Sequence, residues 1–322
     1  MKKLVSNLAP IIKEYLENRR MLGYSDVQEK HLQMFDEYMH NHQSELQTIT
    51  KEAVHKWISY EISRGYGGMY DRVSSVRMLA LYMGNGAYII PNKAVEKRPE
   101  CTPYILTDDE LSRLFYQADN LGHNTNRFVK LMFPTMLRLQ YTCGLRPLEI
   151  RLIKTKNINF DTGEILIEKT KGNNGHKERV VVMSEDMLKL CLKYNTIRSV
   201  LNPQSEYYFV RSDGKPMSQA QLSYTLRNCW RRANAKVEPK ILPRLRPYDI
   251  RHRFATTVLQ QCIDEKRDLN TMLPYLRAYM GHEEFSSTAY YIHLLPENLL
   301  QSSGVDWSEI DMVNPEVDVW KS

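Results

Sequence analysis

A polar, proline-bearing stretch at residues 92–105 (NKAVEKRPECTPYI) divides the chain into two parts. It has neither helical nor strand periodicity, which is typical of a segment between domains. Directly after it, Thr107-Asp-Asp-Glu110 has the pattern of a capping box that opens a new helix. A chain of 322 residues is also long enough for two hydrophobic cores. We therefore expect an N-terminal domain at residues 1–91, a linker at 92–105 and a second domain at 106–296, followed by a tail at 297–322.

The part before this stretch contains helix patterns throughout. Apolar residues recur there at three- and four-residue spacing, with breaks at Gly65 and Gly84. This predicts a compact all-α domain with helices at about 8–22, 26–43, 50–65 and 69–84. In the last helix, Arg72, Ser75 and Arg77 are candidates for contacts with nucleic-acid phosphates, and the alternative is a solvated helix face.

The second part combines helix patterns with a short strand region. Residues 158–167 carry two strand-like runs around Asp161-Thr-Gly163, and Arg179–Met183 adds a third. Helices are expected at about 108–120, 124–143, 146–154, 184–198, 218–235, 248–262, 269–280 and 285–293. The predicted fold class is therefore mainly α (α+β): a helical N-terminal domain, then a mostly helical domain with a small three-stranded antiparallel sheet.

The composition is that of an ordinary soluble globular protein, with 42% hydrophobic and 25% charged residues. No apolar run approaches the roughly 20 residues of a membrane span, and the first residues lack the apolar region of a signal peptide. Five scattered cysteines without a CxxC pair indicate reduced thiols rather than disulfides or a zinc site. We expect a cytoplasmic protein with no membrane partner.

The charge distribution favours a polyanionic partner. The net charge is +6, and residues 227–253 carry nine Lys and Arg against Glu238 and Asp249. The tail from Glu297 carries six acids and a single base, Lys321. A basic centre with an acidic tail is typical of a protein that binds nucleic acid.

Four clusters of chemically active residue types stand apart in the second part. They are Cys143–Glu149 (CGLRPLE), Thr170-Lys171-Gly172, Tyr248–His252 (YDIRH) and Gly281-His282 with Tyr291. Each cluster alone has little specificity, because single arginines and histidines have many structural uses. The clusters gain meaning only when they are considered together.

A phosphodiester explains the residue types of all four clusters. Two guanidiniums can each hold phosphate oxygens bidentately and stay charged at any working pH. A lysine on a hairpin turn can protonate a leaving 5′ oxygen, and a histidine supplies a further donor or base. A tyrosine, whose ordinary pKa is about 10, becomes a nucleophile where neighbouring cations stabilise its phenolate.

The sequence also lacks the usual cofactor motifs. Glu149 is isolated, and Glu283 and Glu284 are adjacent, so they point to different helix faces rather than forming a Mg²⁺ site. Neither a P-loop nor a GxGxxG pattern is present. We therefore expect chemistry that uses no metal and no nucleotide cofactor.

Taken in order, the clusters resemble the signature of the tyrosine recombinase (phage integrase) family. The resemblance covers the whole chain and implies a helical core-binding domain, a linker and a catalytic domain. Residues 261–268 together with Leu273–Met280 (LPYLRAYM) are similar to integrases of transposons and other mobile elements. The motifs that carry it are Gly144-Leu-Arg146 with Glu149, Thr170-Lys-Gly172, Arg251-His-Arg-Phe-Ala-Thr256, Gly281-His282 and Thr288-Ala-Tyr-Tyr-Ile-His293.

The resemblance implies a role for each matching residue. Arg146 and Arg251 match the two catalytic arginines, and Lys171 matches the hairpin lysine that acts as general acid, with Lys169 as the alternative. Tyr291, nine positions after the histidine of the Gly-His pair, matches the nucleophile. The remaining assignments are His282 as an active-site histidine, Glu149 as a positioning acid, and Tyr290, His252 and His293 as structural residues.

Two departures from the family pattern affect these expectations. The second box usually reads His-x-x-Arg, but Tyr248 holds the first position here. A tyrosine can donate a hydrogen bond to phosphate but cannot act as a base near neutral pH, so we expect Tyr248 to be a phosphate ligand. The second departure is a long spacing between Arg251 and His282, which we attribute to a loop around residues 261–268.

The resemblance implies site-specific DNA recombination through a 3′-phosphotyrosyl intermediate. The implied partners are double-stranded DNA sites, three further copies of the chain in a tetramer, and accessory DNA-bending or directionality factors. The tail at 297–322 carries apolar residues within an acidic stretch and is expected either to contact a neighbouring protomer or to fold onto its own domain. The alternatives for function are relaxation of DNA in the manner of a type IB topoisomerase, and a DNA-binding regulator that has lost catalysis.

Overall fold

The computed structural model describes residues 4–24, 27–65, 68–84, 86–95, 102–168, 178–282 and 285–295. These residues form two compact units, one before residue 102 and one from residue 102 onward. Lys171 and the tail from residue 297 lie outside the described residues, as does much of the expected linker. The linker boundaries and the role of the tail therefore stay predictions.

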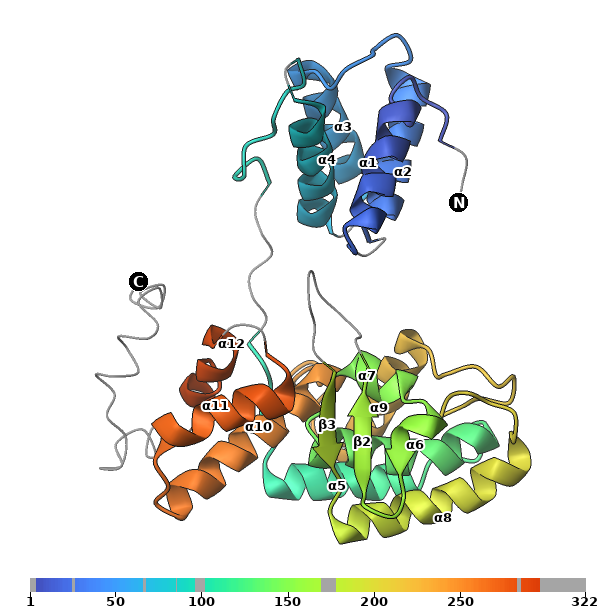
Figure 1. Cartoon of the computed structure of the whole chain (residues 1–322), viewed down its shortest axis with the longest axis vertical. Coiled ribbons are helices and arrows are strands. Elements are labelled where there is room, and N and C mark those ends of the chain that lie inside the picture. Colours follow the sequence, from blue (N-terminus) through green and yellow to red (C-terminus); the bar gives the residue numbers. More distant parts are fainter. Residues whose placement is uncertain are drawn as a thin grey trace. The chain divides into compact units, whose positions relative to one another are not determined.

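The first unit is an all-helical bundle (Figure 1). Its helices in the described residues are α1 (Ala9–Met21), α2 (Val27–His42), α3 (Lys51–Ser63) and α4 (Met69–Met83). Thr50 caps α3, because its side chain accepts a hydrogen bond from the backbone N–H of Ala53. The apolar faces meet around Trp57, which is fully buried and contacts the Phe35 ring edge-on at 4.9 Å between centroids. The helical N-terminal unit predicted from periodicity is confirmed.

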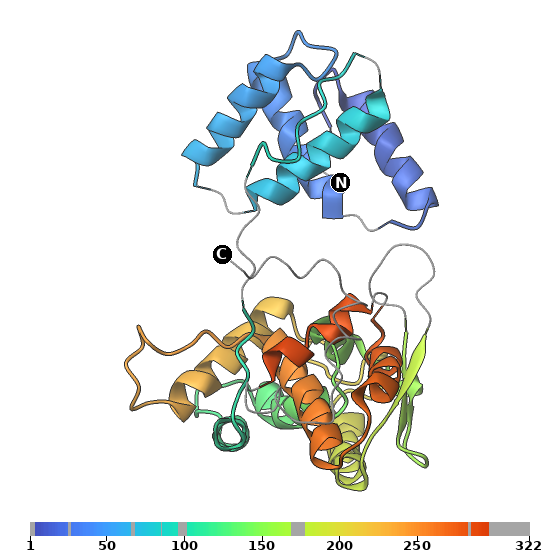
Figure 2. The same cartoon turned by 90° about the vertical axis from the view of Figure 1, so that its left-hand side faces the viewer.

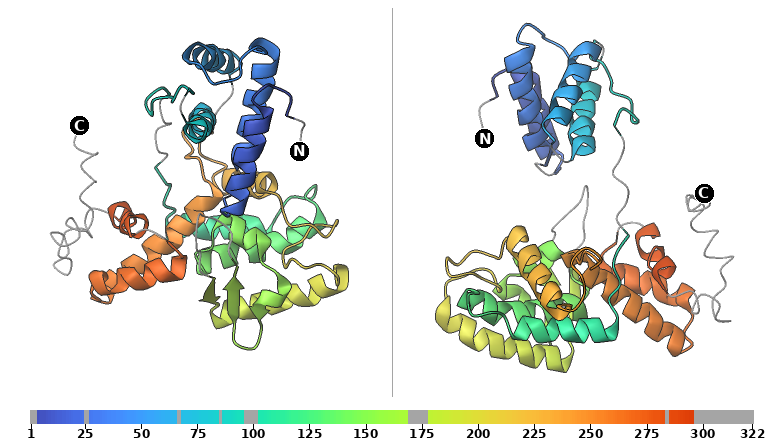
Figure 3. Two further views of the ribbon diagram at one scale, coloured as in Figure 1. Left: turned by 45° about the horizontal axis from the view of Figure 1, so that its top comes forward. Right: turned by 180° about the vertical axis from the view of Figure 1, so that it is seen from behind.

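The second unit begins with the expected capping box. The Thr107 side chain accepts from the backbone of Glu110, and the Glu110 carboxylate accepts from the backbone N–H of Thr107. The helices that follow are α5 (Asp108–Asp119), α6 (Arg127–Thr142), α7 (Pro147–Leu152), α8 (Glu185–Leu201), α9 (Gln219–Ala233), α10 (Pro247–Asp264) and α11 (Leu269–Met280). Helix α6 is central, because α5, α8 and α10 all pack against it (Figure 3).

A small antiparallel sheet lies beside these helices, with β3 at one edge (Figure 2). In the described residues it consists of β1 (Ile158–Asn159), β2 (Glu164–Ile167) and β3 (Arg179–Val182), in the order β1-β2-β3. Ile165 pairs with Ile158 on one side and with Val181 on the other, and all three side chains are buried. The predicted sheet and the turn around Gly163 are confirmed, which agrees with the expected fold class.

Two local expectations were wrong. The helix expected at 285–293 is instead a single turn, α12 (Ser286–Ala289), followed by a 3₁₀ turn at Ile292–Leu294. The backbone N–H of Tyr291 bonds the carbonyl of Thr288, so the chain tightens there to the three-residue spacing of a 3₁₀ turn. The loop expected at 261–268 is shorter, because α10 continues to Asp264.

Two further features of the described residues concern the cysteines and the lengths of the helices. The four cysteines in the described ranges, Cys143, Cys191, Cys229 and Cys262, are buried free thiols. Among the helices of these ranges, none is long and apolar enough to cross a membrane.

Candidate functional site

The same four-residue pattern opens the two helices that carry the predicted arginines. Helix α7 starts at Arg146-Pro147 with Glu149 in its first turn, and α10 starts at Arg246-Pro247 with Asp249 in its first turn. In each case the arginine before the proline is extended and the proline occupies the first helical position. The carboxylate accepts the backbone N–H of that arginine, at 2.7 Å in both helices. This local chemistry fixes where each helix begins.

Arg251 is the most deeply buried of the predicted catalytic residues, with no exposed surface. Its Nη1 donates to the carbonyl of Gly144 at 2.7 Å, and its Nη2 donates to the carbonyl of Met280 at 2.7 Å. Its Nε has no acceptor among the described residues. A buried donor without a partner is unfavourable, so Nε is a candidate donor for a bound ligand.

Arg146 is less deeply buried than Arg251, with 20% of its side chain exposed. Its Nη1 donates to Glu149 at 2.7 Å, and its Nη2 donates to the carbonyl of Gly281. Gly144 and Gly281, whose carbonyls accept from the two arginines, both have left-handed backbone conformations (φ +58° and +65°). Only glycine adopts this conformation without strain, so the two glycines turn their carbonyls toward the arginines at low cost.

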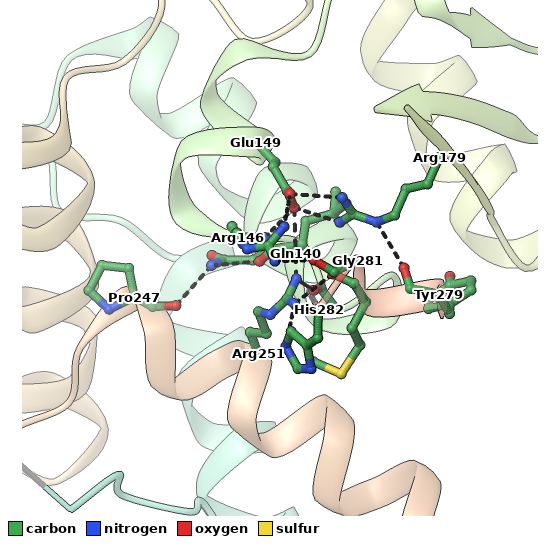
Figure 4. A network of polar contacts seen from close by, with 12 residues as sticks. Gln140, Arg146, Glu149, Arg179, Pro247, Arg251, Tyr279, Gly281 and His282 are labelled. Atoms are coloured by element: carbon green, nitrogen blue, oxygen red, sulfur yellow. Dashed lines mark hydrogen bonds and ion pairs between the residues drawn. The ribbon is translucent and has the colours of Figure 1, made fainter. Parts of the chain in front are cut away.

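Glu149 lies at the centre of a network of guanidiniums (Figure 4). Besides Arg146, it accepts two bonds from Arg179, at 2.9 and 2.7 Å, and it lies 3.8 Å from Arg251. Burial alone would raise the pKa of this carboxyl, but Arg179 and Arg146 outweigh it and lower the pKa to about 2. Glu149 is therefore ionised, and three arginines around one carboxylate leave an excess of positive charge.

His282 follows Gly281 and joins the same network (Figure 4). Its Nε2 lies 2.9 Å from Nη2 of Arg251, and its Nδ1 lies 2.8 Å from the hydroxyl of Thr288, which is fully buried. Burial and the neighbouring Arg251 lower the pKa of His282 to about 3. The imidazole is therefore neutral near pH 7.

The hydroxyl-bearing ring of Tyr291 lies against this cluster. It stacks on the His282 ring, with 5.9 Å between centroids and an angle of 18°, and its hydroxyl interacts electrostatically with Arg251. The residue is only 2% exposed. Burial raises the pKa of Tyr291, although Arg251 acts in the opposite direction. The phenol is thus protonated and covered, with its oxygen already beside a guanidinium.

Tyr248 is the predicted residue that departs from the family pattern. It is 39% exposed, and its hydroxyl interacts electrostatically with Arg146. Its ring contacts His252, which in turn contacts the ring of Tyr291, with 5.3 and 5.4 Å between centroids. Tyr248 therefore lies at the open side of the cluster, next to the arginine that is partly exposed.

Six of the predicted site residues lie together in the structure: Arg146, Glu149, Tyr248, Arg251, His282 and Tyr291. The other predicted site residues do not join this cluster in the described part of the chain. Lys171 lies outside the described residues, so its role stays a prediction. Arg72 is buried and forms an ion pair with Glu61, and Ser75 is buried and donates to the carbonyl of Asp71 at 2.8 Å.

This placement does not fit the predicted phosphate contacts of Arg72 and Ser75. It does not fit a solvated helix face either, because α4 packs these positions against α2 and α3. Arg77 is half-buried and donates from Nε to the carbonyl of Ile90 at 2.9 Å. All three side chains have structural partners within the first unit.

Two members of the network were missed by the reading of the sequence. Arg179, the first residue of β3, has the bidentate contact with Glu149 described above. Gln140 of α6 is buried and donates to the carbonyl of Pro247 at 2.8 Å, so it joins the starts of α7 and α10. The sequence signal for Arg179 was a charged residue at the start of a strand, and the signal for Gln140 was a polar residue inside an apolar helix face.

Comparison with known proteins identifies the family. The model of the phage integrase family matches residues 105–298. The chain belongs to the phage integrase family. This confirms the resemblance drawn from the motifs, and with it the classification as a tyrosine-type site-specific recombinase or integrase.

Individual relatives are distant members of this family. A Sinorhizobium fredii protein described as an integrase or recombinase, y4rE, is 27% identical over 192 residues, which span 59% of each chain. The tyrosine recombinase XerC of Mannheimia succiniciproducens is 24% identical over 234 residues, 71% of each chain. The fold is similar to that of the Tn1549 transposon integrase in complex with transposon right end DNA, at 12% identity and a TM-score of 0.64, covering 94% of this chain and 98% of that one.

This member of the phage integrase family also has a basic surface, formed by α9 and by residues 234–244 that follow it. Arg227 and Arg231 lie one helical turn apart and are exposed, as are Lys236, Lys240 and Arg244. A pocket of about 420 Å³ borders Arg227, Arg231 and Arg244, with Trp230 and Leu242 among its apolar walls. The basic stretch expected from the sequence is therefore divided: these five side chains are exposed, whereas Arg251 is turned inward.

Proposed function

We propose that this protein cleaves and rejoins DNA at specific sites through a covalent tyrosyl intermediate. Tyr291 attacks the scissile phosphorus, a bond forms between its oxygen and phosphorus, and the bond to the 5′ oxygen breaks. This leaves a 3′-phosphotyrosyl link and a free 5′ hydroxyl, and the phenolic proton passes to water. Lys171 protonates the leaving 5′ oxygen. The 5′ hydroxyl of a partner strand then attacks the phosphotyrosyl phosphorus and releases Tyr291. The step needs neither ATP nor a metal.

The observation that carries this proposal is the hydroxyl of Tyr291 beside Arg251, within a cluster that also contains Arg146 and His282. The arginines supply the positive charge that a phosphodiester needs as its non-bridging oxygens gain charge in the transition state. The unpartnered Nε of Arg251 and the open side of Arg146 are donors for those oxygens. Tyr248, whose hydroxyl interacts electrostatically with Arg146, adds a further hydroxyl donor at the open side.

Tyr291 must leave its covered position before it can attack. It is 2% exposed, and its hydroxyl lies beside the guanidinium that the phosphate would bind. Entry of a phosphate between Arg146 and Arg251 would replace the phenol as the partner of Arg251. DNA binding and release of the nucleophile are therefore parts of one event in this proposal.

The proposed partners follow from the family and from the charge of the surface. Exposed Arg227 and Arg231 on α9 supply cations for the phosphate backbone of double-stranded DNA. Strand exchange between two DNA sites needs four active tyrosines, so we include a tetramer of this chain, assisted by accessory DNA-bending or directionality factors. A transposon integrase among the structural neighbours supports action on a mobile element, and cytoplasmic localisation is part of the same proposal.

A suicide DNA substrate tests the chemistry directly. The DNA that flanks the gene supplies candidate sites. A nick close to the scissile phosphate lets the short fragment that carries the free 5′ hydroxyl diffuse away, so that the covalent protein–DNA adduct is trapped. We expect a protein–DNA adduct that forms in the presence of EDTA and is lost in Tyr291→Phe. Tyr290→Phe is the matched control, because Tyr290 is the adjacent residue and is 36% exposed. It should retain adduct formation.

The same assay separates the two alternatives. Relaxation of supercoiled DNA by the wild type, without recombinant product from paired sites, would favour a topoisomerase-like enzyme. Site-specific binding with no adduct on any flanking site would leave the non-catalytic regulator. A metal requirement would appear as loss of the adduct in EDTA and would contradict the metal-free step.

A further inference from the structure

Arg179 belongs to the sheet, yet its side chain enters the network around Glu149 (Figure 4). Its Nη1 and Nη2 donate to the two oxygens of Glu149 at 2.9 and 2.7 Å, and its Nε donates to the carbonyl of Tyr279 at 2.8 Å. The side chain is 13% exposed. All three of its side-chain nitrogens thus donate to Glu149 or to the backbone carbonyl of Tyr279, and none of these bonds is directed at a substrate.

Because Arg179 binds Glu149, the donors of Arg146 and Arg251 are more available for a substrate phosphate. A carboxylate offers about four lone-pair positions, and Arg179 takes one on each oxygen of Glu149. The negative charge of Glu149 is thereby balanced by a residue with little exposed surface. Without Arg179, that charge would be opposed by Arg146 and Arg251 alone, the two guanidiniums that have donors available for a phosphate.

Arg179 also supports the turn that leads into His282. Tyr279, whose carbonyl it binds, lies two residues before Gly281, and the carbonyl of Gly281 accepts from Arg146. A Cβ added at Gly281 would lie 3.0 Å from Nη1 of Arg179, so the guanidinium packs closely against this turn. One side chain therefore touches both supports of the site: the carboxylate that orients Arg146 and the turn that presents His282.

We propose that Arg179 is a positioning residue for cleavage, which aligns Arg146 and His282 by binding Glu149 and the carbonyl of Tyr279. The proposal rests on the cleavage reaction proposed above. A lysine at this position would keep the charge but could not bond both carboxylate oxygens and the carbonyl in the same plane. Arg179 acts through Glu149, so the two residues must depend on each other energetically.

A double-mutant cycle tests this dependence. Adduct formation on the suicide substrate is measured under single turnover, together with DNA affinity, for the wild type, Arg179→Gln, Glu149→Gln and the double variant. Misplacement of catalytic groups by about 1 Å can slow a reaction about 100-fold, and we expect a loss of this order in Arg179→Gln at nearly unchanged DNA affinity. In the Glu149→Gln background, replacing Arg179 should cost clearly less than in the wild type, because only its contact with the Tyr279 carbonyl remains to be lost.

Two further variants keep the test decisive. Arg179→Lys should fall between the wild type and Arg179→Gln. Arg138→Gln is the matched control, because Arg138 makes a bidentate pair with Asp119 at 2.8 Å, outside this network. It should cleave at the wild-type rate. Should Arg179→Gln fail to fold, Arg179→Lys and the double variant, which buries no lone carboxylate, complete the comparison.

The inference is overturned if folded Arg179→Gln cleaves like the wild type. It is also overturned if replacing Arg179 costs the same with and without Glu149, or if DNA affinity falls in parallel with the rate. Failure of the proposed function looks different, because the wild type itself would then give no adduct.

Discussion

Nη2 of Arg251 donates a hydrogen bond to Nε2 of His282 across 2.9 Å. A guanidinium has no acceptor, so Nε2 must be the unprotonated nitrogen of a neutral imidazole. Nδ1 then carries the hydrogen and donates it to the hydroxyl of Thr288 at 2.8 Å. The tautomer of His282 follows from these two neighbours, and it is the state expected from a pKa of about 3.

Thr288→Val should weaken this arrangement. Valine has a similar shape but no hydroxyl, so Nδ1–H of His282 would lose its acceptor in a buried position. A buried donor without a partner costs about 1–3 kcal/mol, which should appear as a lower denaturant midpoint. Cleavage should also slow, because His282 is no longer fixed. Thr288→Ser restores the hydroxyl, and equal effects of serine and valine would contradict the assigned tautomer.

Stability should fall as the pH drops below about 6.5. Burial lowers the pKa of His282 to about 3 and that of His252 to about 4 from an ordinary value of 6.5. Between these values and 6.5 the unfolded chain binds more protons than the folded chain, so the free energy of unfolding rises with pH in that window. Urea unfolding from pH 7 to 4 measures the slope. The slope should become shallower in His282→Gln, and an unchanged slope would rule out this source.

Gly144→Ala should cost more than the same change at Gly163. Both glycines have a left-handed backbone (φ +58° and +73°), and a non-glycine residue there costs about 1–2 kcal/mol. At Gly163 the nearest atom to an added Cβ is 3.5 Å away, whereas at Gly144 the ring of Phe254 is at 2.3 Å. Gly144→Ala should therefore be less stable than Gly163→Ala. Its cleavage rate should also fall, because the Gly144 carbonyl that accepts from Arg251 would move.

Arg227→Ala and Arg231→Ala should weaken DNA binding without preventing folding. Each phosphate contact that is lost should lower the slope of log affinity against log salt by about one. Both residues are exposed on α9. Lys189→Ala on α8, where the side chain is 71% exposed, removes the same charge elsewhere and should leave the slope unchanged. Fluorescence anisotropy across a salt series measures the slope for all three variants. Slopes of Arg227→Ala and Arg231→Ala equal to that of the wild type would show that α9 does not contact DNA phosphates.

Local patterns in the sequence were enough to predict the sheet and the helices other than the one expected at 285–293. Helix starts depend on neighbours such as Thr107 with Glu110, and the sheet depends on alternating residues around the turn at Gly163. The motifs also identified Arg146, Arg251, His282 and Tyr291 as members of one site. These features are encoded within a few residues of each other, or are anchored by a family signature.

Contacts between distant segments were not predictable in the same way. Arg179 meets Glu149 across 30 positions and Tyr279 across 100, and a charged residue at a strand start does not by itself identify such partners. Arg72 was assigned to phosphate because its charge was visible, but its partner Glu61 lies on another helix. The depth at which Tyr291 is buried likewise depends on how α10, α11 and the last turns pack, which periodicity does not report.

The two left-handed glycines also set limits for anyone who would retarget this enzyme to a new DNA sequence. The carbonyl of each accepts a hydrogen bond from an arginine of another segment, Gly144 from Arg251 and Gly281 from Arg146, so each is needed for its backbone shape rather than for a side chain. A randomised library that includes these positions would consist mostly of inactive members. Diversity is better placed on the exposed face of α9, where side chains can change while the catalytic frame stays intact.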